Sequence, residues 1–401
     1  MSIRQDVLSA FRRADDWIFE RCGRPRVLFV ASDGNGFGCQ SPVIRALRAT
    51  GRTTVHVVAQ DNRRSRHFVF NTEADRTLFE ALRMDARLAS LRKWHLVVYS
   101  HLCSFYPRRN ALLAYMHHGP GFGSGGGHHA VTRCDLYFGL SEAEFSYLDD
   151  RLPGVLGVSK AYFPVGFPKV DSLVRGEFDR GAVRDRFRLG AEKTVLIASS
   201  WKSGGLVRAL DAGPFEALAQ AFPNWNVVQN GHPWLWQRRS DVDPAWQDQV
   251  MRRMREVEQR YPNARFLPNV PAEELAAVSD LLVADRTSVV TTFALLDRPI
   301  VLFDNPELPD YSRRAALPYL QAAEVFRHPD ALIEACHTAM ANPQDKRLER
   351  QKLSEMFYAN PGSAAQEMAH AIEDLGRVCS TQSTGWPRVM SLSQRTRTSA
   401  T

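Results

Sequence analysis

Short runs of apolar and β-branched residues recur along this chain, and most of them lead into a loop and then into a stretch with helical periodicity. Such runs are typical of strands buried on both faces, as in a parallel sheet. Strands that alternate with helices predict the α/β class. The expected strands are residues 26–32, 53–59, 95–99, 111–116, 134–140, 161–165, 193–202, 225–229, 264–267, 280–284 and 299–303.

The length of 401 residues suits two domains rather than one. A helical stretch over 172–187 precedes a fresh start of the alternation, which puts the domain boundary between 170 and 190. We therefore expect an amphipathic helix over 1–25, a Rossmann-like domain over 26–185, a second over 186–378 and a disordered tail over 379–401. Two doubly wound domains facing each other across a cleft form the architecture used by nucleotide-sugar transferases.

Composition narrows the class of protein. The 51 Lys and Arg outnumber the 44 Asp and Glu, and the net charge of +7 favours anionic partners such as phosphates or acidic lipid headgroups. We expect no nucleic-acid partner. No run approaches the ~20 apolar residues of a membrane span, and the first residues lack the order of a signal peptide, so we expect a cytoplasmic protein. The helix over 1–25 is expected to dock on the body or to touch the inner leaflet of the membrane. The six cysteines include no Cys-x-x-Cys pair, which argues against a zinc site or a disulfide framework.

Two loops of the second predicted domain follow strands and carry residues suited to an anion. Residues 230–236 read Asn-Gly-His-Pro-Trp-Leu-Trp, and Thr287 and Ser288 open a predicted helix. Ligands of open α/β sheets collect at the carboxyl ends of strands. A helix N-terminus with hydroxyl side chains offers donors and the positive end of the helix dipole to a phosphate, and His232 could neutralise the same anion. The alternative is that Thr287 or Ser288 only caps a helix and that His232 only fills a turn.

One strand of the first predicted domain ends in a histidine pair and a glycine-rich loop. His117 and His118 precede residues 119–127, which include six glycines. A histidine at the carboxyl end of a strand, beside an open loop, suits a general base near neutral pH. The alternative is a pair of surface histidines in a flexible turn. His128 and His129 follow, but no nearby Asp, Glu or Cys completes a ligand spacing, so no metal site is predicted.

A second glycine-rich turn, Asp-Gly-Asn-Gly-Phe-Gly at 33–38, follows the first predicted strand. The next helix is expected to begin near Ser41 and Pro42, because proline suits the first turn of a helix. The spacing is G-x-G-x-G rather than G-x-G-x-x-G, and no acidic residue closes the next strand. The turn is therefore a poor match to a dinucleotide site.

Five short motifs occur in an order that is more specific than any one of them. They are His118-Gly119, Gly166-Phe-Pro-Lys-Val-Asp171, residues 195–202, Gly231-His-Pro233, and residues 279–288 with 293–300. In order and spacing they resemble the CDP-glycerol glycerophosphotransferase family, and Asn360-Pro-Gly-Ser-Ala364 extends the resemblance over most of 95–376. The family builds teichoic acids and related phosphate-linked polymers on the GT-B fold. Its members move an alditol phosphate from a CDP-alditol to a hydroxyl acceptor and release CMP.

The resemblance implies roles for individual residues. His118, in the His-Gly motif, matches the family's base, with the neighbouring His117 as the alternative. His232 matches a phosphate contact, and Thr287 and Ser288 match a Ser-Ser pair at the phosphate-binding helix. The pyrophosphate would be held by His232, Thr287, Ser288 and Lys202, and no metal ion or other cofactor is expected for this role. The implied partners are a CDP-alditol donor and a lipid-linked or polymeric hydroxyl acceptor.

Departures from the family pattern bear on the substrates more than on the fold. The family's loop after His-Gly usually continues Thr-Pro-Leu-Lys, whereas Pro120-Gly-Phe-Gly123 lacks the basic residue. The usual Asp-Tyr-Ser-Ser is Asp285-Arg-Thr-Ser288, and Thr292 stands where an acidic residue is expected. Arg286 would supply a replacement charge near the phosphates unless it is a surface residue. Asp285 belongs with Arg286 to the candidate phosphate-binding residues, and Gly119 and Asp171 complete the candidate set as motif residues.

Two other readings remain open at this point. A GT-B glycosyltransferase or an epimerase that uses a nucleotide sugar would share the fold and the phosphate-binding helix, but it would need no His-Gly motif. A non-catalytic binding protein would keep the same architecture for a polymer or a partner. Release of CMP from a CDP-alditol, release of UDP or an epimerised sugar, and binding without turnover would distinguish the three.

Overall fold

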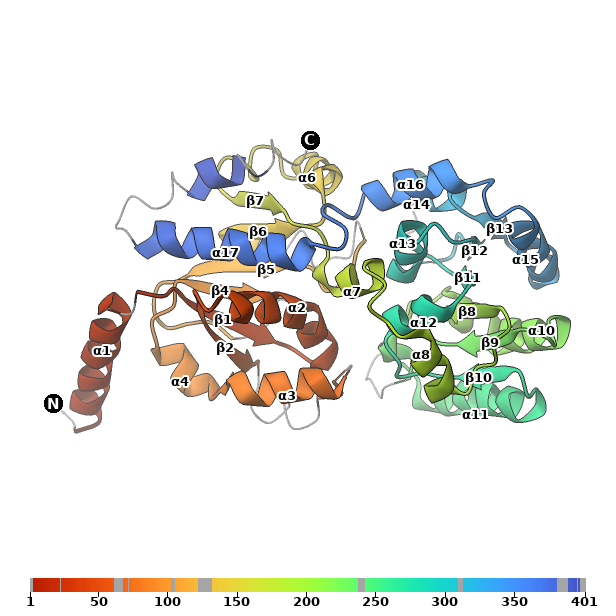
Figure 1. Cartoon of the computed structure of the whole chain (residues 1–401), viewed down its shortest axis with the longest axis horizontal. Coiled ribbons are helices and arrows are strands. Elements are labelled where there is room, and N and C mark those ends of the chain that lie inside the picture. Colours follow the sequence, from red (N-terminus) through yellow and green to blue (C-terminus); the bar gives the residue numbers. More distant parts are fainter. Residues whose placement is uncertain are drawn as a thin grey trace. The chain divides into compact units, whose positions relative to one another are not determined.

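The structure, a computed structural model of the full chain, describes residues 3–21, 23–60, 68–70, 72–101, 105–121, 132–236, 242–308, 313–380, 389–394 and 396. The chain divides into two compact units (Figure 1). Unit 1 is Met1–Asp171 with Phe357–Thr401, and unit 2 is Ser172–Met356. Each unit holds one parallel sheet with helices packed on it.

The sheet of unit 1 has the strand order β3-β2-β1-β4-β5-β6-β7, and every pairing is parallel. Its strands are β1 (Arg26–Ala31), β2 (Thr54–Ala59), β3 (Arg83–Met84), β4 (Leu96–Tyr99), β5 (Leu112–Met116), β6 (Leu136–Gly139) and β7 (Ala161–Pro164). The helices are α1 (Ile3–Arg21), α2 (Gly34–Thr50), α3 (Glu73–Leu82), α4 (Ala86–Leu91), α6 (Glu142–Asp149), η2 (Pro168–Val170) and α17 (Ala364–Ser380), with α7 (Asp171–Val174) at the junction of the units. Helices α2 and α17 run side by side over the sheet (Figure 1).

The sheet of unit 2 has the order β10-β9-β8-β11-β12-β13 and is also parallel throughout. Its strands are β8 (Thr194–Ala198), β9 (Asn226–Gln229), β10 (Ala264–Phe266), β11 (Leu281–Ala284), β12 (Ile300–Phe303) and β13 (Glu324–Phe326). The helices are α8 (Arg180–Phe187), α9 (Leu206–Leu210), α10 (Gly213–Ala221), η3 (Pro233–Leu235), α11 (Pro244–Arg260), α12 (Ala272–Val278), α13 (Ser288–Leu295), α14 (Arg313–Gln321), η4 (Pro329–Ala331), α15 (Leu332–Ala341) and α16 (Arg347–Glu355).

Burial of the central strands explains why the class could be read from the sequence. Every residue of β1, β4, β8 and β11 is buried, so each of these strands appears as a continuous apolar run. The predicted α/β class with two Rossmann-like domains is confirmed. The short strands β3 and β13 at the sheet edges were not predicted, because two or three residues give no recognisable pattern.

The helix after β1 begins earlier than predicted. Helix α2 starts at Gly34, with the Asp33 carboxylate accepting a hydrogen bond from Gly36 N, so most of the glycine-rich turn is helical and Pro42 lies inside the helix. Proline cannot donate to the carbonyl four residues earlier, that of Gly38. Ser41 Oγ lies 3.4 Å from that carbonyl oxygen and donates to it. The expected start near Pro42 was wrong because the Asp33 cap determines where the helix begins.

The C-terminal segment differs from the expected boundaries. Helix α17, which the sequence placed in the second domain, packs on α2 in unit 1. Asp171 accounts for this arrangement, since its carboxylate accepts hydrogen bonds from Ala364 N at 3.2 Å and Ala365 N at 2.7 Å at the start of the helix. Within the tail expected to be disordered, residues 389–394 are helical, and Ser393 Oγ donates to the Tyr162 carbonyl at 2.6 Å.

Helix α1 docks on unit 1 through one face. Asp15 is buried and bonds Arg26 Nη1 at 2.7 Å, and the Phe19 ring stacks on His95 with centroids 4.1 Å apart. The expected docking is therefore confirmed, whereas Val7, Trp17 and Ile18 remain exposed. Among the described residues, none of the helices combines the length and the apolar character that a membrane crossing requires.

Candidate functional site

The predicted site residues follow strands at the places where the strand order of each sheet reverses. The order reverses between β1 and β4 in unit 1 and between β8 and β11 in unit 2. Ligands of open α/β sheets bind at such points, outside the carboxyl ends of the strands. Lys202 follows β8, His232 follows β9, Asp285 to Ser288 follow β11, and His118 follows β5, the neighbour of β4.

The hydrogen bond of His118 fixes which of its ring nitrogens carries the proton. His118 Nδ1 lies 2.9 Å from the carbonyl oxygen of Ser100, at the end of β4. A carbonyl oxygen can only accept, so Nδ1 is the donor. In the neutral ring this leaves the lone pair on Nε2. The half-buried His118 therefore has the tautomer that a general base acting through Nε2 requires.

A second histidine lies against the first. The rings of His101 and His118 are stacked, with centroids 3.7 Å apart and planes 25° from parallel. His101 Nδ1 lies 3.0 Å from Ser32 Oγ, and Ser32 Oγ donates to Asp33 Oδ2 at 3.3 Å. Burial lowers the pKa of His101, and the negative charge of Asp33 opposes that shift. We call His101, Ser32 and Asp33 the His101 chain.

Glycine at position 36 allows α2 to approach this pair. A Cβ atom there would lie 3.1 Å from His101 Nδ1, 3.1 Å from Ser100 Oγ and 3.2 Å from Ser32 Oγ, closer than most Cβ contacts in proteins. The glycine-rich turn, a poor match to a dinucleotide site in the sequence, thus has a local packing reason. Lys169, in the motif after β7, reaches the same turn and donates to Asn35 Oδ1 at 3.3 Å.

His117 belongs to a buried polar cluster. Its side chain is 5% exposed, and Nε2 lies 2.6 Å from Glu144 Oε1 and 2.7 Å from the Tyr137 hydroxyl. Tyr162 also donates to Glu144, at 3.0 Å to Oε2. Burial and the nearby Glu144 charge raise the pKa of both tyrosines well above its usual value. Of the two adjacent histidines, the one nearer the solvent-facing edge is therefore His118.

The loop after these histidines is described only in part. Gly119 is half-buried and Pro120 is buried, while residues 122–131, with His128 and His129, lie outside the described residues. Across the described part of the chain, no group of three or more His, Cys, Asp or Glu side chains is arranged to hold a metal ion.

His232 in unit 2 has the opposite hydrogen-bonding arrangement. Its Nδ1 accepts a hydrogen bond from Trp234 N at 3.2 Å, at the start of η3. An accepting Nδ1 carries the lone pair, so the neutral ring has its hydrogen on Nε2. The indole rings of Trp201 and Trp234 lie 6.4 Å and 5.1 Å from the imidazole, centroid to centroid. His232 therefore presents a donor at Nε2, which suits a phosphate oxygen.

Thr287 and Ser288 stand at the N-terminus of α13, as predicted. Thr287 is the N-cap, and its hydroxyl accepts from Val289 N at 3.2 Å. Ser288 is exposed at the first helical position. Thr292, at the position where the family has an acidic residue, is buried, and its hydroxyl lies 3.4 Å from the Ser288 carbonyl. The capping role of Thr287 is thus real, and Ser288 is the hydroxyl left at the helix surface.

Asp285 holds the loop between β8 and α9. It is fully buried, and its carboxylate accepts hydrogen bonds from Ser200 N at 3.0 Å, Leu206 N at 2.6 Å and Ser199 Oγ at 2.9 Å. Burial raises the pKa of Asp285, and these donors oppose the shift. A Cβ at Gly205 would lie 3.0 Å from Asp285 Oδ2, so the loop follows the carboxylate closely. Asp285 thus contacts the loop that carries Lys202, rather than facing a ligand.

The remaining candidates lie in different surroundings. Lys202 is half-buried in the loop that Asp285 holds, and Arg286 is half-buried between Asp285 and the N-cap of α13. Asp171 lies elsewhere, because both of its carboxylate oxygens bond the first N–H groups of α17 in unit 1. The structure therefore separates Asp171, a capping residue, from the group of Lys202, His232 and Asp285 to Ser288 in unit 2.

Sequence reasoning missed His101 and the Ser100 carbonyl. Both follow directly on β4, as His117 and His118 follow β5, so a histidine just past a buried strand was a signal that could have been used. Ser32 was counted as the end of a strand, although its hydroxyl joins His101 to Asp33. Their importance comes from packing between loops that are far apart in sequence, which periodicity does not record.

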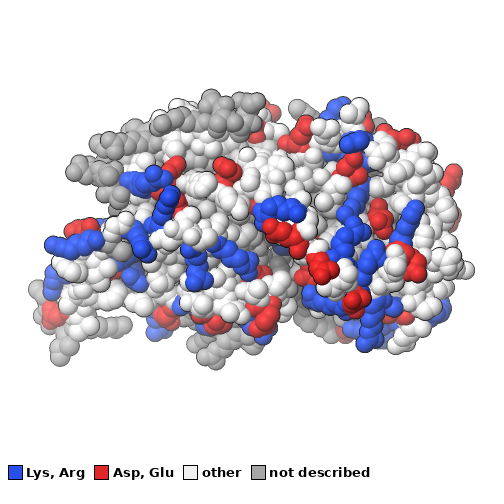
Figure 2. Space-filling model, in the orientation of Figure 1, with Lys and Arg blue, Asp and Glu red and all other residues white. Residues whose placement is uncertain are grey.

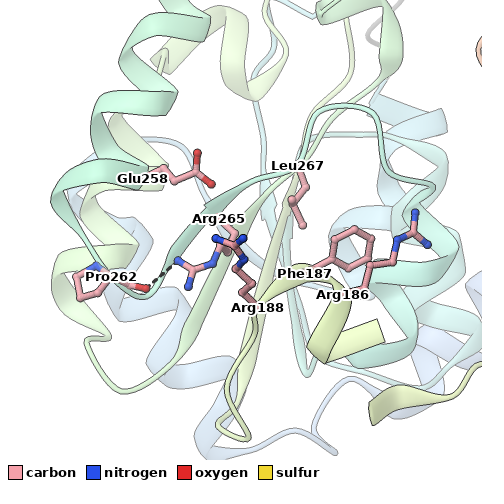
Figure 3. Close-up of a pocket in the computed structure, with 7 residues that line it drawn as sticks. All are labelled: Arg186, Phe187, Arg188, Glu258, Pro262, Arg265 and Leu267. Carbon is pink, nitrogen blue, oxygen red and sulfur yellow. Dashed lines mark hydrogen bonds between the residues drawn. The ribbon is translucent and has the colours of Figure 1, made fainter. Parts of the chain in front are cut away.

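A cavity of about 590 Å³ lies elsewhere in unit 2 (Figure 3). It is lined by Arg186, Phe187, Arg188, Glu258, Pro262, Arg265 and Leu267. Arg265 Nη1 donates to the Pro262 carbonyl at 2.8 Å, and Arg186 pairs with Glu274 at 2.8 Å. None of the predicted site residues lines this cavity. On the face drawn in Figure 2, basic and acidic groups are interspersed over unit 2.

Comparisons with known proteins bear on the whole chain. Among solved structures, the wall teichoic acid polymerase TagF matches with a TM-score of 0.58 at 13% identity, covering 94% of this chain and 99% of that chain. A TagF variant soaked with CDPG matches with a TM-score of 0.58 at 12% identity, covering 93% and 95%. The UDP-GlcNAc 2-epimerase from Neisseria meningitidis, bound to UDP-GlcNAc, matches with a TM-score of 0.59 at 13% identity, covering 86% and 98%.

These structural matches show the fold, which is that of GT-B enzymes. No curated protein matches the sequence significantly. The model of the CDP-Glycerol:Poly(glycerophosphate) glycerophosphotransferase family matches residues 149–374, which is more than half of the chain and includes β7, η2, the strands of unit 2 and most of α17. The chain therefore belongs to the CDP-Glycerol:Poly(glycerophosphate) glycerophosphotransferase family.

Proposed function

We propose that this protein transfers an alditol phosphate, with glycerol phosphate as the first candidate, from a CDP-alditol to a hydroxyl acceptor and releases CMP. The reaction would serve the synthesis of a teichoic-acid-type or capsular polymer of the cell envelope. Family membership supports the reaction type. The observation that carries the assignment of roles is the opposite bonding of two histidines, since Nδ1 of His118 donates and Nδ1 of His232 accepts.

His118 is the proposed base. The acceptor hydroxyl gives its proton to His118 Nε2 as its oxygen attacks the phosphorus that carries the alditol. The bond from that phosphorus to the bridging oxygen of the pyrophosphate breaks, and CMP leaves with that oxygen. A base of this kind typically contributes about 10²–10⁴-fold to the rate. The bond from Nδ1 to the Ser100 carbonyl keeps the ring in the tautomer that this step needs.

The donor pyrophosphate is proposed to bind unit 2. His232 Nε2–H, the Ser288 hydroxyl and the N-terminus of α13 supply donors, and Lys202 supplies a positive charge. Arg286 is a further candidate for that charge. These groups meet the charge of the pyrophosphate in the proposal, so it invokes no cofactor. Asp285 acts through the loop that it holds, because its carboxylate fixes Ser200 and Leu206 on either side of Lys202.

The acceptor is proposed to be a lipid-linked or polymeric alcohol at the cytoplasmic face of the membrane. Helix α1 supports a peripheral contact there, because Val7, Trp17 and Ile18 are exposed on it. The guanidinium of Arg21 lies over the Trp17 ring, 4.7 Å from its centroid. Aromatic and aliphatic side chains next to arginine suit the headgroup region of a bilayer.

A nucleotide-sugar enzyme is the second candidate, and the similarity to the Neisseria meningitidis epimerase favours it. Such an enzyme would use the same helix N-terminus for its nucleotide phosphates, but it would not depend on a base at His118. Nucleotide binding alone cannot distinguish the two candidates, because both bind a nucleotide. The identity of the product can.

The test is a donor panel. Purified protein is incubated with CDP-glycerol, CDP-ribitol or UDP-GlcNAc, each with a glycerol-phosphate-terminated lipid acceptor, and the released nucleotide and the extended acceptor are measured by mass spectrometry. The proposal expects CMP and an acceptor longer by one alditol phosphate. Formation of UDP or of an epimerised sugar would instead support the second candidate, and binding of CDP-glycerol without any product would indicate a binding protein.

A further inference from the structure

The stacked ring of His101 is not used by the chemistry described so far. We propose that His101 is a positioning residue that holds the ring of His118 in its plane and tautomer, and that the glycine-rich turn of α2 exists to support it. The inference rests on the proposed function, because it assumes that His118 is the base. His101 itself need not touch either substrate.

The direction of the hydrogen bonds in the His101 chain can be assigned. Asp33 Oδ2 can only accept from the Ser32 hydroxyl, 3.3 Å away. Having given its hydrogen to Asp33, Ser32 Oγ accepts from His101 Nδ1 at 3.0 Å. The carboxylate therefore lies at the end of a chain of donors and fixes His101 with its hydrogen on Nδ1. Asp33 is itself fixed by Gly36 N, which donates to its other oxygen at 2.7 Å.

The stack limits the motion of His118. Rotation of the His118 ring out of its plane would bring its edge into the His101 ring, because the centroids are 3.7 Å apart. A half-turn about the Cβ–Cγ bond returns the ring to the same plane but replaces Nδ1 at the Ser100 carbonyl by Cδ2 and loses the 2.9 Å hydrogen bond. The stack thus opposes the passage out of the plane, the hydrogen bond favours one of the two orientations within it, and both are needed to keep Nε2 in one place.

The charge state of His101 also suits a residue that positions the His118 base. A general base becomes a cation when it takes its proton, and a second cation stacked on it would oppose this step. Burial lowers the pKa of His101, which keeps its ring neutral near pH 7. A neutral ring presents its π face to the new imidazolium of His118, an arrangement that favours the cation.

The backbone is built to bring these groups together. Gly36 lies so close to His101, Ser100 and Ser32 that a Cβ atom there would require their side chains to shift by a few tenths of an ångström. Gln40, one turn further along α2, donates to Ser100 Oγ at 3.1 Å and to the Val30 carbonyl at 2.9 Å. Helix α2 therefore braces the loops after β1 and β4 from one side, which gives the Gly-rich sequence a function other than binding a dinucleotide.

Four variants separate positioning from simple packing. His101→Ala removes the ring stack and the hydrogen bonds of the His101 chain. His101→Phe keeps a flat ring without Nδ1, and Ser32→Ala removes only the link from His101 to Asp33. His56→Phe is the matched control, since His56 contacts Trp94 edge-on at 5.7 Å between centroids and lies in β2, outside the site. The measurements are kcat and KM for CMP release from CDP-glycerol, and the ¹⁵N shifts of the His118 ring, which distinguish a protonated from an unprotonated nitrogen.

The expected result is a loss in kcat with little change in KM for the donor. His101→Ala should lower kcat by roughly 10²-fold, the effect of a displacement of about 1 Å at a reacting group. His101→Phe should restore part of that loss, and the ¹⁵N shifts of His118 should show a mixture of tautomers in His101→Ala and Ser32→Ala. His56→Phe should match the wild type in both measurements.

The inference is overturned if His101→Ala, shown to be folded by circular dichroism, keeps the wild-type kcat and His118 shifts. If that variant does not fold, His101→Phe and Ser32→Ala decide the matter in the same way, because wild-type shifts in both would exclude positioning. Failure of the proposed function looks different. In that case His118→Ala retains transfer, while the ¹⁵N shifts of the histidine variants still show whether His101 holds the ring.

Discussion

Unit 1 and unit 2 each present a histidine from a loop after a parallel strand, but the two rings are hydrogen-bonded in opposite senses. His118 gives its Nδ1 hydrogen to the Ser100 carbonyl, whereas the Nδ1 lone pair of His232 receives a hydrogen from Trp234 N. The first arrangement leaves a lone pair at Nε2 and the second leaves a hydrogen there. One side chain can therefore act as a proton acceptor in one unit and as a phosphate ligand in the other.

The surroundings of the two rings differ in the same way. His118 stacks on another imidazole, which is linked to a carboxylate. His232 lies beside two indole rings, those of Trp201 and Trp234, which carry no charge. The nearest carboxylate of the unit 2 group, Asp285, is fully buried and bonded to backbone N–H groups. In the proposed roles, unit 1 supports a group that becomes positive and unit 2 binds a negative ligand.

The largest effect is expected at His118. Replacing it with alanine should lower kcat by about 10²–10⁴-fold, because the base is lost, while the affinity for CDP-glycerol stays within experimental error. Stopped-time assays of CMP release and calorimetric titration measure the two quantities. A His118→Ala protein with the kcat of the wild type would remove the distinction between the two histidines, and a protein that fails to bind CDP-glycerol would place His118 in the donor site.

A substitution of Asp285 tests whether its buried carboxylate holds the loop that carries Lys202 in the form that binds the donor. Asp285→Asn should destabilise the protein by roughly 3 kcal/mol and weaken donor binding, since an amide nitrogen would face backbone N–H donors. Asp280 provides a matched control at the other end of β11, where its carboxylate accepts from Thr194 N at 2.9 Å. Asp280→Asn should affect stability alone. Equal donor affinities in the two variants would argue that the loop carrying Lys202 does not form the donor site.

The donor ligands themselves should have smaller effects. His232→Ala and Ser288→Ala each remove one hydrogen bond to a charged group, worth about 1.5–3 kcal/mol, so the Kd for CDP-glycerol should rise by roughly one to two decades. The value of kcat at saturating donor should fall less than in His118→Ala. Titration with CDP-glycerol, CDP and UDP gives the Kd values. Unchanged affinities in both variants would refute the donor site.

Much of the fold could be predicted from the sequence, because strands buried on both faces appear as continuous apolar runs. All the strands around the two reversals of order were expected, and so were His118, His232 and the Thr287 cap, each just past a strand. What decided these positions was local, namely an apolar run and the residues that end it. The start of α2 was local too, but two signals competed, and the Asp33 cap overrode the proline cue.

The rest could not be predicted, because it depends on contacts between distant segments. Asp171 looked like a motif residue, yet its partners are Ala364 N and Ala365 N, nearly two hundred positions away. Asp285 looked like a ligand of phosphate, and only the fold shows that its carboxylate faces the loop after β8. His101 had no motif at all, and its place on His118 arises from the adjacency of β4 and β5.

The smallest effect is the coupling between residues, and it tests the comparison most directly. If His232 and Ser288 contact the same pyrophosphate, the double mutant should depart from the sum of the single losses in donor binding by about 0.5–3 kcal/mol, as expected for residues that share a partner. In the proposal His118 contacts the acceptor and Ser288 contacts the donor, so their double mutant should be additive to within ~0.5 kcal/mol for donor binding. Both cycles use the same Ser288→Ala background and the same CDP-glycerol titration, which makes the second cycle the control for the first. Additivity in both cycles would mean that His232 and Ser288 serve separate sites, and strong coupling in both would mean that His118 also contacts the donor, which would abolish the division of labour between the two histidines.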